Sequence, residues 1–330
     1  MKTTLYPKHL AQFRISLNQR LTNRVSQLEL DSYFADEILK RIEKGRKIRS
    51  FLFITTAEEL SSNLPESLLL DVCLSIEMSH AASVLVDDIL DGDDVRHGYQ
   101  SSQATLGTPA STLQAHFLCS EAITLVRSWP EIQNQLVDTY RRLSVGEMYD
   151  IFMPQPTDQW ICNGYTERIY QKTSALFEYS LVAAALVAKR GDLKEQLRSI
   201  GQTLGKLYQL SNDYYDMQPH NLRKRHTTDH SWRITFFFPL AIFLQLHGLS
   251  SVQEELNQQL LSYDQWMKFL EKIWTKDVSE IAMAALTQTE KDAKELIESS
   301  MLPAEIRGQF TNLIELIVQE EFWYHSYDAQ

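Results

Sequence analysis

Helical periodicity dominates the pattern of apolar and polar positions along this chain. Apolar residues recur every three to four positions, a spacing that predicts helices near residues 9–28, 32–44, 66–91, 111–127, 131–152, 164–189, 193–217, 235–247, 263–274, 278–298 and 303–323. Strand signals are weak, because alternation at period two never persists between turn residues. Glycine and proline are few and scattered, and no stretch of them marks a linker. We therefore predict an all-α protein with a single domain over residues 1–330.

Composition narrows the classes of partner. The net charge is −11, from 43 acidic and 32 basic residues, whereas a nucleic-acid surface needs a basic stripe. An anionic substrate stays possible, because bound cations can reverse the local field. The three cysteines, Cys73, Cys119 and Cys162, are widely spaced. They suit a reducing compartment better than a disulfide framework.

Targeting signals are weak. The first ten residues, MKTTLYPKHL, lack the apolar core of a secretory signal. No apolar run approaches the ~20 residues that span a bilayer, and the strongest candidate, 236–246, is short and contains Pro239. We expect no transmembrane segment and a cytoplasmic location.

The first chemically informative stripe lies on the predicted helix 66–91. His80, Asp87 and Asp91 share one face, because each helical residue advances by about 100°. Two carboxylates four residues apart repel each other, unless both bind a divalent cation. Oxygen ligands favour magnesium, which usually keeps several waters and bridges to phosphates. A solvated acidic helix end is the alternative, although acids at a helix C-terminus oppose the helix dipole.

A second stripe lies on the predicted helix 193–217. Gln209, Asp213 and Asp216 fall on one face, with Asn212 beside them, on a helix that is otherwise apolar enough to be buried. Buried carboxylates need partners. Two such stripes predict that both helices face one shared site for metal and an organic diphosphate.

Five motifs in order resemble the trans-isoprenyl diphosphate synthases, the farnesyl and geranylgeranyl diphosphate synthase family, over nearly all of residues 40–240. DDILD with Arg96-His97-Gly98 resembles the first aspartate-rich motif of that family, and YQLSNDYYD resembles the second. The others are Gly45-Arg46-Lys47-Ile48-Arg49-Ser50 for GKRxRP, Lys172-Thr173 for the KT pair, and Gly146-Glu147 with Asp150 for GQ…D. The resemblance implies an isoprenoid synthase-type helical bundle around a central apolar cavity, and, by analogy alone, a homodimer.

The resemblance also implies a role for each matching residue. Magnesium would be held by the two aspartate-rich segments, directly or through water, at Asp87, Asp88, Asp91, Asn212, Asp213 and Asp216. Lys172 and Arg96 would grip the allylic diphosphate, and Thr173 and Gln209 would stabilise the developing cation. The remaining diphosphate contacts, to isopentenyl diphosphate or by closure over both substrates, would come from Gly45, Arg46, Arg49, His80, His97, Lys224 and Arg233.

The implied reaction is elongation of an allylic prenyl diphosphate by isopentenyl diphosphate. Magnesium, arginine and lysine neutralise the leaving diphosphate. Apolar walls then keep water from the allylic cation, which the double bond of isopentenyl diphosphate attacks.

The chain departs from the family pattern at four places. His97 replaces an arginine, Arg46 replaces a lysine, and Asn212 replaces an acid, while the C-terminus EEFWYHSYDAQ is acidic and aromatic where many relatives are basic. One alternative is therefore a terpene cyclase, or a prenyltransferase to another acceptor. A second is a non-catalytic subunit of a heteromeric synthase. Retention of Arg46, Arg49 and His80 favours elongation, and the intact DDILD and Lys172-Thr173 argue against the subunit.

Product length is partly predictable by the same resemblance. Bulky residues just before the first aspartate block the growing tail in the family, whereas this chain has Ser83 and Ala82, with Ser79 and Ile76 one and two turns deeper. By this resemblance, the small side chains leave room for a product of about twenty carbons or longer. Close packing against a neighbouring helix would explain the same small residues.

Overall fold

The computed structural model describes residues 5–43, 45–92, 95–96, 99–151, 158–219, 234, 237–258 and 261–324. Its helices are α1 (Leu5–Val25), α2 (Ser32–Ile42), α3 (Ile48–Leu60), α4 (Glu66–Asp91), α5 (Ser102–Leu106), α6 (Thr108–Leu125), α7 (Pro130–Ile151), α8 (Asp158–Gln171), α9 (Thr173–Val187), α10 (Lys194–Asp216), α12 (Phe238–His247), α13 (Gln253–Asn257), α14 (Tyr263–Ile273), α15 (Lys276–Glu298), α16 (Ala304–Ile317) and α17 (Glu320–Tyr324). Two short 3-10 turns, η1 (Gly191–Leu193) and η2 (Leu249–Val252), precede α10 and α13.

The all-α prediction is confirmed. Among the described residues the only strands are β1 (Val95–Arg96) and β2 (Tyr99–Gln100), which form one two-residue antiparallel ladder after α4. Strands of two residues are too short to produce a period-two pattern in the sequence, and they leave the fold all-α.

The number and the limits of the helices differ from the prediction in several places. α3, α5 and α13 were not predicted; α3 is buried on most of its circumference, so its sequence has no amphipathic period. The predicted helix 164–189 is two helices that meet at Lys172, whose backbone (φ −92°, ψ −81°) leaves the helical region. The predicted helix 303–323 is likewise divided, into α16 and α17.

In the described ranges, one helix, α4, has the length and composition of a membrane span. In its most apolar stretch, 72% is buried inside the protein. A buried core helix has the same composition as a span, so this observation is weak support for a membrane segment.

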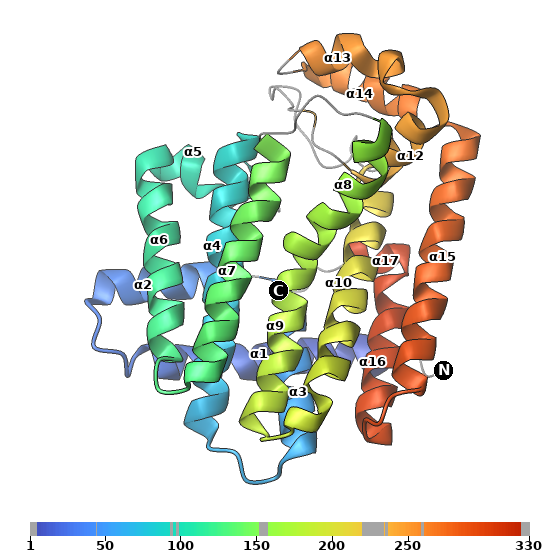
Figure 1. Cartoon of the computed structure of the whole chain (residues 1–330). Coiled ribbons are helices and arrows are strands. Elements are labelled where there is room, and N and C mark those ends of the chain that lie inside the picture. The colour runs from blue at the N-terminus through green and yellow to red at the C-terminus, as the bar shows by residue number, and fades with distance from the viewer. Residues whose placement is uncertain are drawn as a thin grey trace.

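Helix α9 occupies the centre of the fold (Figure 1). Nearly all its side chains are buried, and it contributes to two core clusters. One cluster joins it to α10, α12 and α14–α17, and the other joins it to α1, α2, α4, α6 and α7. A helix buried on all sides is largely apolar, which explains the run of alanine, leucine and valine in α9.

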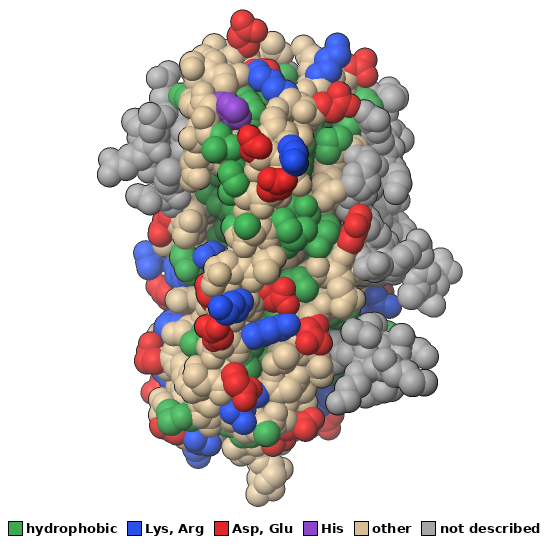
Figure 2. Space-filling model, turned by 90° about the vertical axis from the view of Figure 1, so that its right-hand side faces the viewer, with side chains coloured by type: hydrophobic (Ala, Val, Ile, Leu, Met, Phe, Trp, Pro, Cys, Tyr) green, Lys and Arg blue, Asp and Glu red, His purple; other side chains and the backbone are tan. Residues whose placement is uncertain are grey.

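The C-terminal ends of α4 and α10 lie at the same end of the bundle, at the top of Figure 1. Both aspartate-rich segments are at these ends. Figure 2 shows the face that includes α15; over its described part, acidic and basic side chains are interspersed with apolar ones, and Lys and Arg do not gather into a stripe.

The backbones of α9 and α10 approach each other at two glycines. A Cβ atom at Gly205 would lie 2.5 Å from Ser174 Cα, and one at Gly201 would lie 2.7 Å from Glu178 Cα. Both contacts are to backbone atoms, so no side-chain movement could relieve them. The two glycines therefore set the spacing of these helices.

We expect Gly205→Ala to lower the free energy of unfolding by about 1–3 kcal/mol, because the added methyl group forces the two backbones apart. The measurement is a denaturant or thermal unfolding curve. Gly308→Ala is the control: it lies in α16 with nothing near its Cβ position, so alanine there should be neutral or stabilising by up to about 1 kcal/mol. Equal effects of the two variants would contradict the close approach.

Candidate active site

The site is centred on Lys172, at the junction of α8 and α9. Its Nζ atom lies 2.8 Å from Asp87 Oδ1, on α4, and 2.9 Å from Glu147 Oε2, on α7. The tertiary structure therefore brings together the first aspartate-rich segment and the predicted diphosphate-binding lysine, 85 positions apart in numbering, in one ion-pair cluster.

Glu147 is a site residue whose contact with Lys172 could not be foreseen from sequence. Burial and the charge of Asp87 raise the pKa of Glu147 to about 8, against the opposing effect of the Lys172 ammonium. The available signal was its place in the Gly146-Glu147 motif, but spacing along one helix does not indicate which lysine an acid meets.

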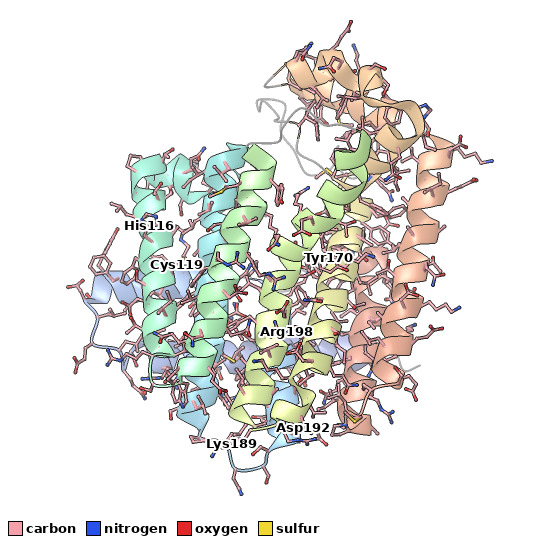
Figure 3. The ribbon with its side chains drawn as sticks, viewed as in Figure 1. His116, Cys119, Tyr170, Lys189, Asp192 and Arg198 are labelled. Atoms are coloured by element: carbon pink, nitrogen blue, oxygen red, sulfur yellow. The ribbon has the colours of Figure 1, made fainter. Side chains whose placement is uncertain are left out.

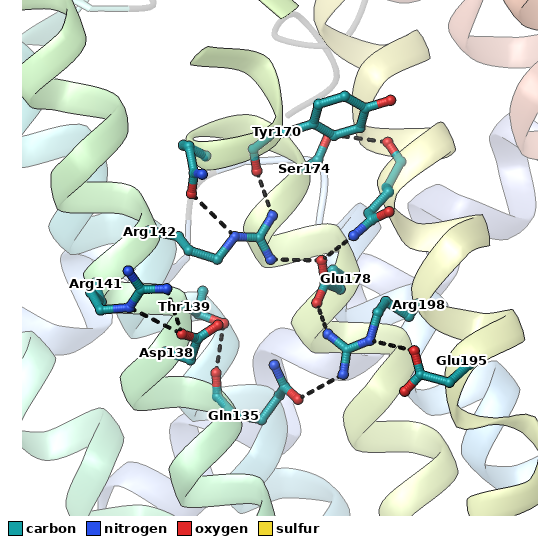
Figure 4. Close-up of polar contacts among 12 residues, drawn as sticks. Gln135, Asp138, Thr139, Arg141, Arg142, Tyr170, Ser174, Glu178, Glu195 and Arg198 are labelled. Atoms are coloured by element: carbon teal, nitrogen blue, oxygen red, sulfur yellow. Dashed lines mark hydrogen bonds and ion pairs between the residues drawn. The ribbon is translucent and has the colours of Figure 1, made fainter. Parts of the chain in front are cut away.

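Helix α7 also fixes the backbone around Lys172. A Cβ atom at Gly146 would lie 3.1 Å from both Lys172 N and Lys172 Cβ, so a larger residue there would require α7 and Lys172 to move apart by a few tenths of an ångström. Arg142, one turn earlier, donates to the Tyr170 carbonyl oxygen at 2.6 Å and to Gln171 Oε1 at 3.4 Å. The same arginine pairs with Glu178 at 2.6 Å (Figure 4).

Glu178 links this junction to α10. It is 1% exposed and accepts hydrogen bonds from Arg142, Arg198 and Gln202. In Figure 3, Tyr170 lies on α8 and Arg198 lower, beside α9. Two guanidinium groups satisfy one buried carboxylate, which is the condition for burying such a charge, and the network holds α7, α9 and α10 together below the site.

Thr173 and Gln209 are hydrogen-bonded to each other. Thr173 Oγ1 donates to Gln209 Oε1 at 2.5 Å, and Gln209 Nε2 donates to Asp213 Oδ1 at 2.6 Å. This chain of hydrogen bonds runs from the N-terminus of α9 to the second aspartate-rich segment. It orients the Gln209 amide, because its oxygen and nitrogen have different partners.

Asp213 faces the protein interior. It is 3% exposed, and its Oδ2 accepts hydrogen bonds from Tyr165 OH at 2.7 Å and from the backbone N–H of Phe238 at 3.0 Å. Burial raises the pKa of Asp213, while the charge of Arg168 and these donors oppose the rise. Asp213 thus joins α8, α10 and α12, and its three hydrogen bonds leave at most one acceptor position of this carboxylate for a metal ion. Asn212 and Asp216 beside it are half-buried.

The carboxylates at this end of the bundle fit a cation that is completed by other ligands. Asp87 and Asp91 are half-buried and Asp88 is buried, and all are oxygen donors of the kind magnesium prefers. Within the described ranges, no three His, Cys, Asp or Glu side chains come close enough to enclose a metal ion. Diphosphate oxygens and water would have to supply the remaining ligands.

Arg46 contacts the C-terminal helix. Its guanidinium lies 4.2 Å from the ring centre of Phe322 and 4.8 Å from that of Trp323. It donates to the Phe322 carbonyl oxygen at 3.1 Å and to Tyr208 OH at 3.2 Å. This predicted diphosphate ligand is therefore held by aromatic side chains on α17 and α10, and the acidic, aromatic C-terminus noted in the sequence includes two of them.

The segment before α3 turns one basic residue inward. Lys47 has a left-handed backbone (φ 58°), which costs a non-glycine residue roughly 1–2 kcal/mol. Its ammonium is buried and pairs with Glu77 on α4 at 3.0 Å, and Ser50 Oγ donates to the other oxygen of Glu77 at 2.5 Å. The ion pair between Lys47 and Glu77 stabilises the turn at Lys47. Arg46 precedes this turn and Arg49 follows it in the sequence.

Arg49 lies against aromatic rings. Its guanidinium is 4.8 Å from the ring centre of Phe177 and 5.9 Å from that of Tyr208, and burial lowers its pKa.

Two further predicted diphosphate contacts are described. Gly45 precedes the turn at Lys47 and has φ 94°, a conformation that favours glycine. His80 is half-buried on the inner part of α4.

Four predicted site residues lie wholly or partly outside the described part of the chain. His97, Lys224 and Arg233 lie outside the described residues, and for Arg96 only the backbone, in β1, is described.

The predicted chain-length positions are closely packed. Ile76, Ser79 and Ala82 are at most 2% exposed, and Ser83 is half-buried. The hydroxyls of Ser79 and Tyr140, on α7, lie 2.7 Å apart, and those of Ser75 and Tyr179, on α9, lie 2.8 Å apart. Tyrosines on neighbouring helices thus occupy the space beside the small residues of α4.

We expect Arg46→Lys to lower the free energy of unfolding by about 1–3 kcal/mol. An ammonium cannot lie flat on two rings while donating to both Tyr208 and Phe322. Chemical denaturation measures the change, with Arg141→Lys, an exposed arginine of α7, as the matched control. A variant as stable as wild type would show that Arg46 does not hold α17.

Comparison with known proteins agrees with this arrangement. The model of the polyprenyl synthetase family matches residues 33–259. An octaprenyl diphosphate synthase of Haemophilus influenzae is 31% identical over 176 residues, 52% of each protein. The chain spans about half the length of the curated relatives it matches first.

Two solved structures share the fold. A geranylgeranyl pyrophosphate synthase from Lactobacillus brevis superposes with a TM-score of 0.79 at 17% identity, over 96% of this chain and 99% of that one. A polyprenyl synthase from Caulobacter crescentus, complexed with calcium and isoprenyl diphosphate, gives 0.76 at 20% identity, over 94% and 95%. With the family model covering more than half of its residues, the chain belongs to the polyprenyl synthetase family, a family of trans-prenyltransferase enzymes.

Proposed function

We propose that this chain condenses an allylic prenyl diphosphate with isopentenyl diphosphate. The observation that carries the proposal is the position of Lys172 beside Asp87, with Thr173 and Gln209 hydrogen-bonded to each other at the same end of the bundle. A cationic side chain beside a carboxylate that could hold a divalent ion suits the neutralisation of a leaving diphosphate.

Magnesium is the proposed cofactor, held by Asp87, Asp91 and Asp216 with Asp88 in support, and it would neutralise the diphosphate charge. The calcium in the Caulobacter crescentus relative supports a divalent ion. The protein's own groups have separate tasks. Lys172 binds the diphosphate, while the Thr173 hydroxyl and the Gln209 amide oxygen turn negative dipoles toward the cation that forms.

A homodimer is proposed by analogy with the family. Exposed apolar side chains on two neighbouring helices support it. Leu113 on α6 is 68% exposed, and Val137 and Met148 on α7 are 49% and 53% exposed. Neighbouring helices with several exposed apolar residues are typical of an interface.

A second candidate function follows from Arg46. Since its guanidinium is occupied by Phe322 and Tyr208, the acceptor side could take a molecule without a diphosphate, or the prenyl group could be cyclised. The relatives support elongation more directly, because octaprenyl and hexaprenyl synthases are among them.

The deciding experiment incubates the protein with magnesium and farnesyl diphosphate, with and without isopentenyl diphosphate. We expect longer prenyl diphosphates only when isopentenyl diphosphate is present, detected by chromatography with mass spectrometry. A hydrocarbon or alcohol formed without it would instead indicate cyclisation, and no turnover in either mixture would favour a non-catalytic subunit. Chelation of the metal should abolish the product.

A second incubation, with a shorter allylic diphosphate in place of farnesyl diphosphate, measures product length. We propose about twenty carbons or longer, on the basis of the small residues at positions 79, 82 and 83 of α4. Tyr140 and Tyr179, which fill the adjacent space, would then have to turn aside as the chain grows. A product that stops at farnesyl diphosphate from shorter allylic substrates would contradict this length.

We expect His97→Arg to lower the Michaelis constant for isopentenyl diphosphate by several-fold, roughly the value of one charge-assisted contact. Imidazole is only partly charged near neutral pH, whereas guanidinium is always charged. Steady-state kinetics with isopentenyl diphosphate as the varied substrate gives the answer. An unchanged constant would place residue 97 outside the acceptor site.

A further inference from the structure

Within the part of the chain that the structure describes, Lys172 has two carboxylate partners of different kinds. Asp87 belongs to the first aspartate-rich segment and is a proposed metal ligand, whereas Glu147 belongs to α7 and has no proposed role in metal binding. Both contacts are short, 2.8 Å and 2.9 Å, and all three side chains are at most 20% exposed. Ion pairs in such an environment are stronger than those on the surface.

Asp87 and Glu147 would not both keep their ion pair with Lys172 during a reaction. A divalent ion bound at Asp87 would draw that carboxylate toward itself, so the ammonium would lose this contact when the metal and diphosphate arrive. Of the two described carboxylates, Glu147 would then be the one that still holds the Lys172 ammonium beside the site. Without such a contact, a flexible lysine side chain has to be ordered by the substrate, which costs rotamer entropy.

The backbone around Glu147 favours this role. Gly146, its neighbour, lets α7 approach Lys172 closely, and Arg142 fixes Tyr170 and Gln171 just before Lys172. Arg142, Gly146 and Glu147 of α7 therefore all contact the junction of α8 and α9. Of these three residues, Glu147 contacts the ammonium group of Lys172.

We propose that Glu147 is a positioning residue, which holds the ammonium of Lys172 toward the diphosphate of the bound substrate. The proposal rests on the proposed function, because it needs a diphosphate at this end of the bundle. It goes beyond that function by assigning a role to a residue of α7.

The test is a double-mutant cycle with inorganic pyrophosphate and magnesium, measured by isothermal titration calorimetry. Wild type, Glu147→Leu, Lys172→Ala and the double variant are compared. We expect each single variant to weaken pyrophosphate binding about tenfold, the value of one charge-assisted contact. The double variant should bind no more weakly than Lys172→Ala, because Glu147 acts through that lysine.

Two further variants separate positioning from folding. Glu147→Gln keeps an oxygen that can accept from Lys172 and should recover part of the lost affinity. Glu131→Leu, at the exposed other glutamate of α7, should bind pyrophosphate as wild type does. Thermal unfolding of each variant confirms that the folded protein is being titrated.

The outcomes distinguish this inference from the proposed function. If wild type binds pyrophosphate and Glu147→Leu binds it equally well, or if the two single effects add in the double variant, Glu147 does not position Lys172. If wild type itself does not bind pyrophosphate with magnesium, the proposed function fails. A turnover assay extends the test: kcat should fall more than the Michaelis constant rises, since charge on the diphosphate is greatest as it leaves.

Discussion

The close approach of α9 and α10 is the constraint on which the site depends. At Gly201 and Gly205 the second helix has no side chain, and the backbone of α9 occupies that space. This spacing brings Thr173, at the start of α9, to within a hydrogen bond of Gln209 on α10, and Gln209 in turn contacts Asp213. A larger residue at either glycine would separate these helices and with them the two halves of the site.

The charged and polar groups of the site already have partners within the protein. Lys172 lies between two carboxylates, Asp213 accepts three hydrogen bonds, and Glu178 is neutralised by two arginines. Buried charges require such partners. Binding of a metal and a diphosphate would therefore exchange internal partners for external ones, and the residues that keep their partners, such as Glu147 with Lys172, would preserve the geometry during the exchange.

The acceptor side has a different character. Arg46 and Arg49 lie against Phe177, Tyr208, Phe322 and Trp323, so their charges are placed among aromatic rings. Trp323 Nε1 donates to the Ile317 carbonyl oxygen at 2.9 Å, and Tyr215 OH donates to that of Val318 at 2.7 Å. The last carbonyls of α16 have no hydrogen-bond donor within their own helix, and these two bonds supply one. They also hold α17 in contact with Arg46.

The sequence by itself determined the helical class, the exact span 66–91 of α4, and the two stripes of polar residues, because a helix converts spacing into direction. Family motifs added the candidate residues. Tertiary structure alone decided that Lys172 interrupts a helix, that Asp213 turns inward to Tyr165 and Phe238, that Arg46 meets Phe322, and that Glu147 reaches Lys172. These contacts join residues far apart in the chain, and periodicity along one helix carries no information about which side chain another helix presents. Tyr140 and Tyr179 show the same limit: small residues on α4 indicated space, and only the packing of α7 and α9 determined what fills it.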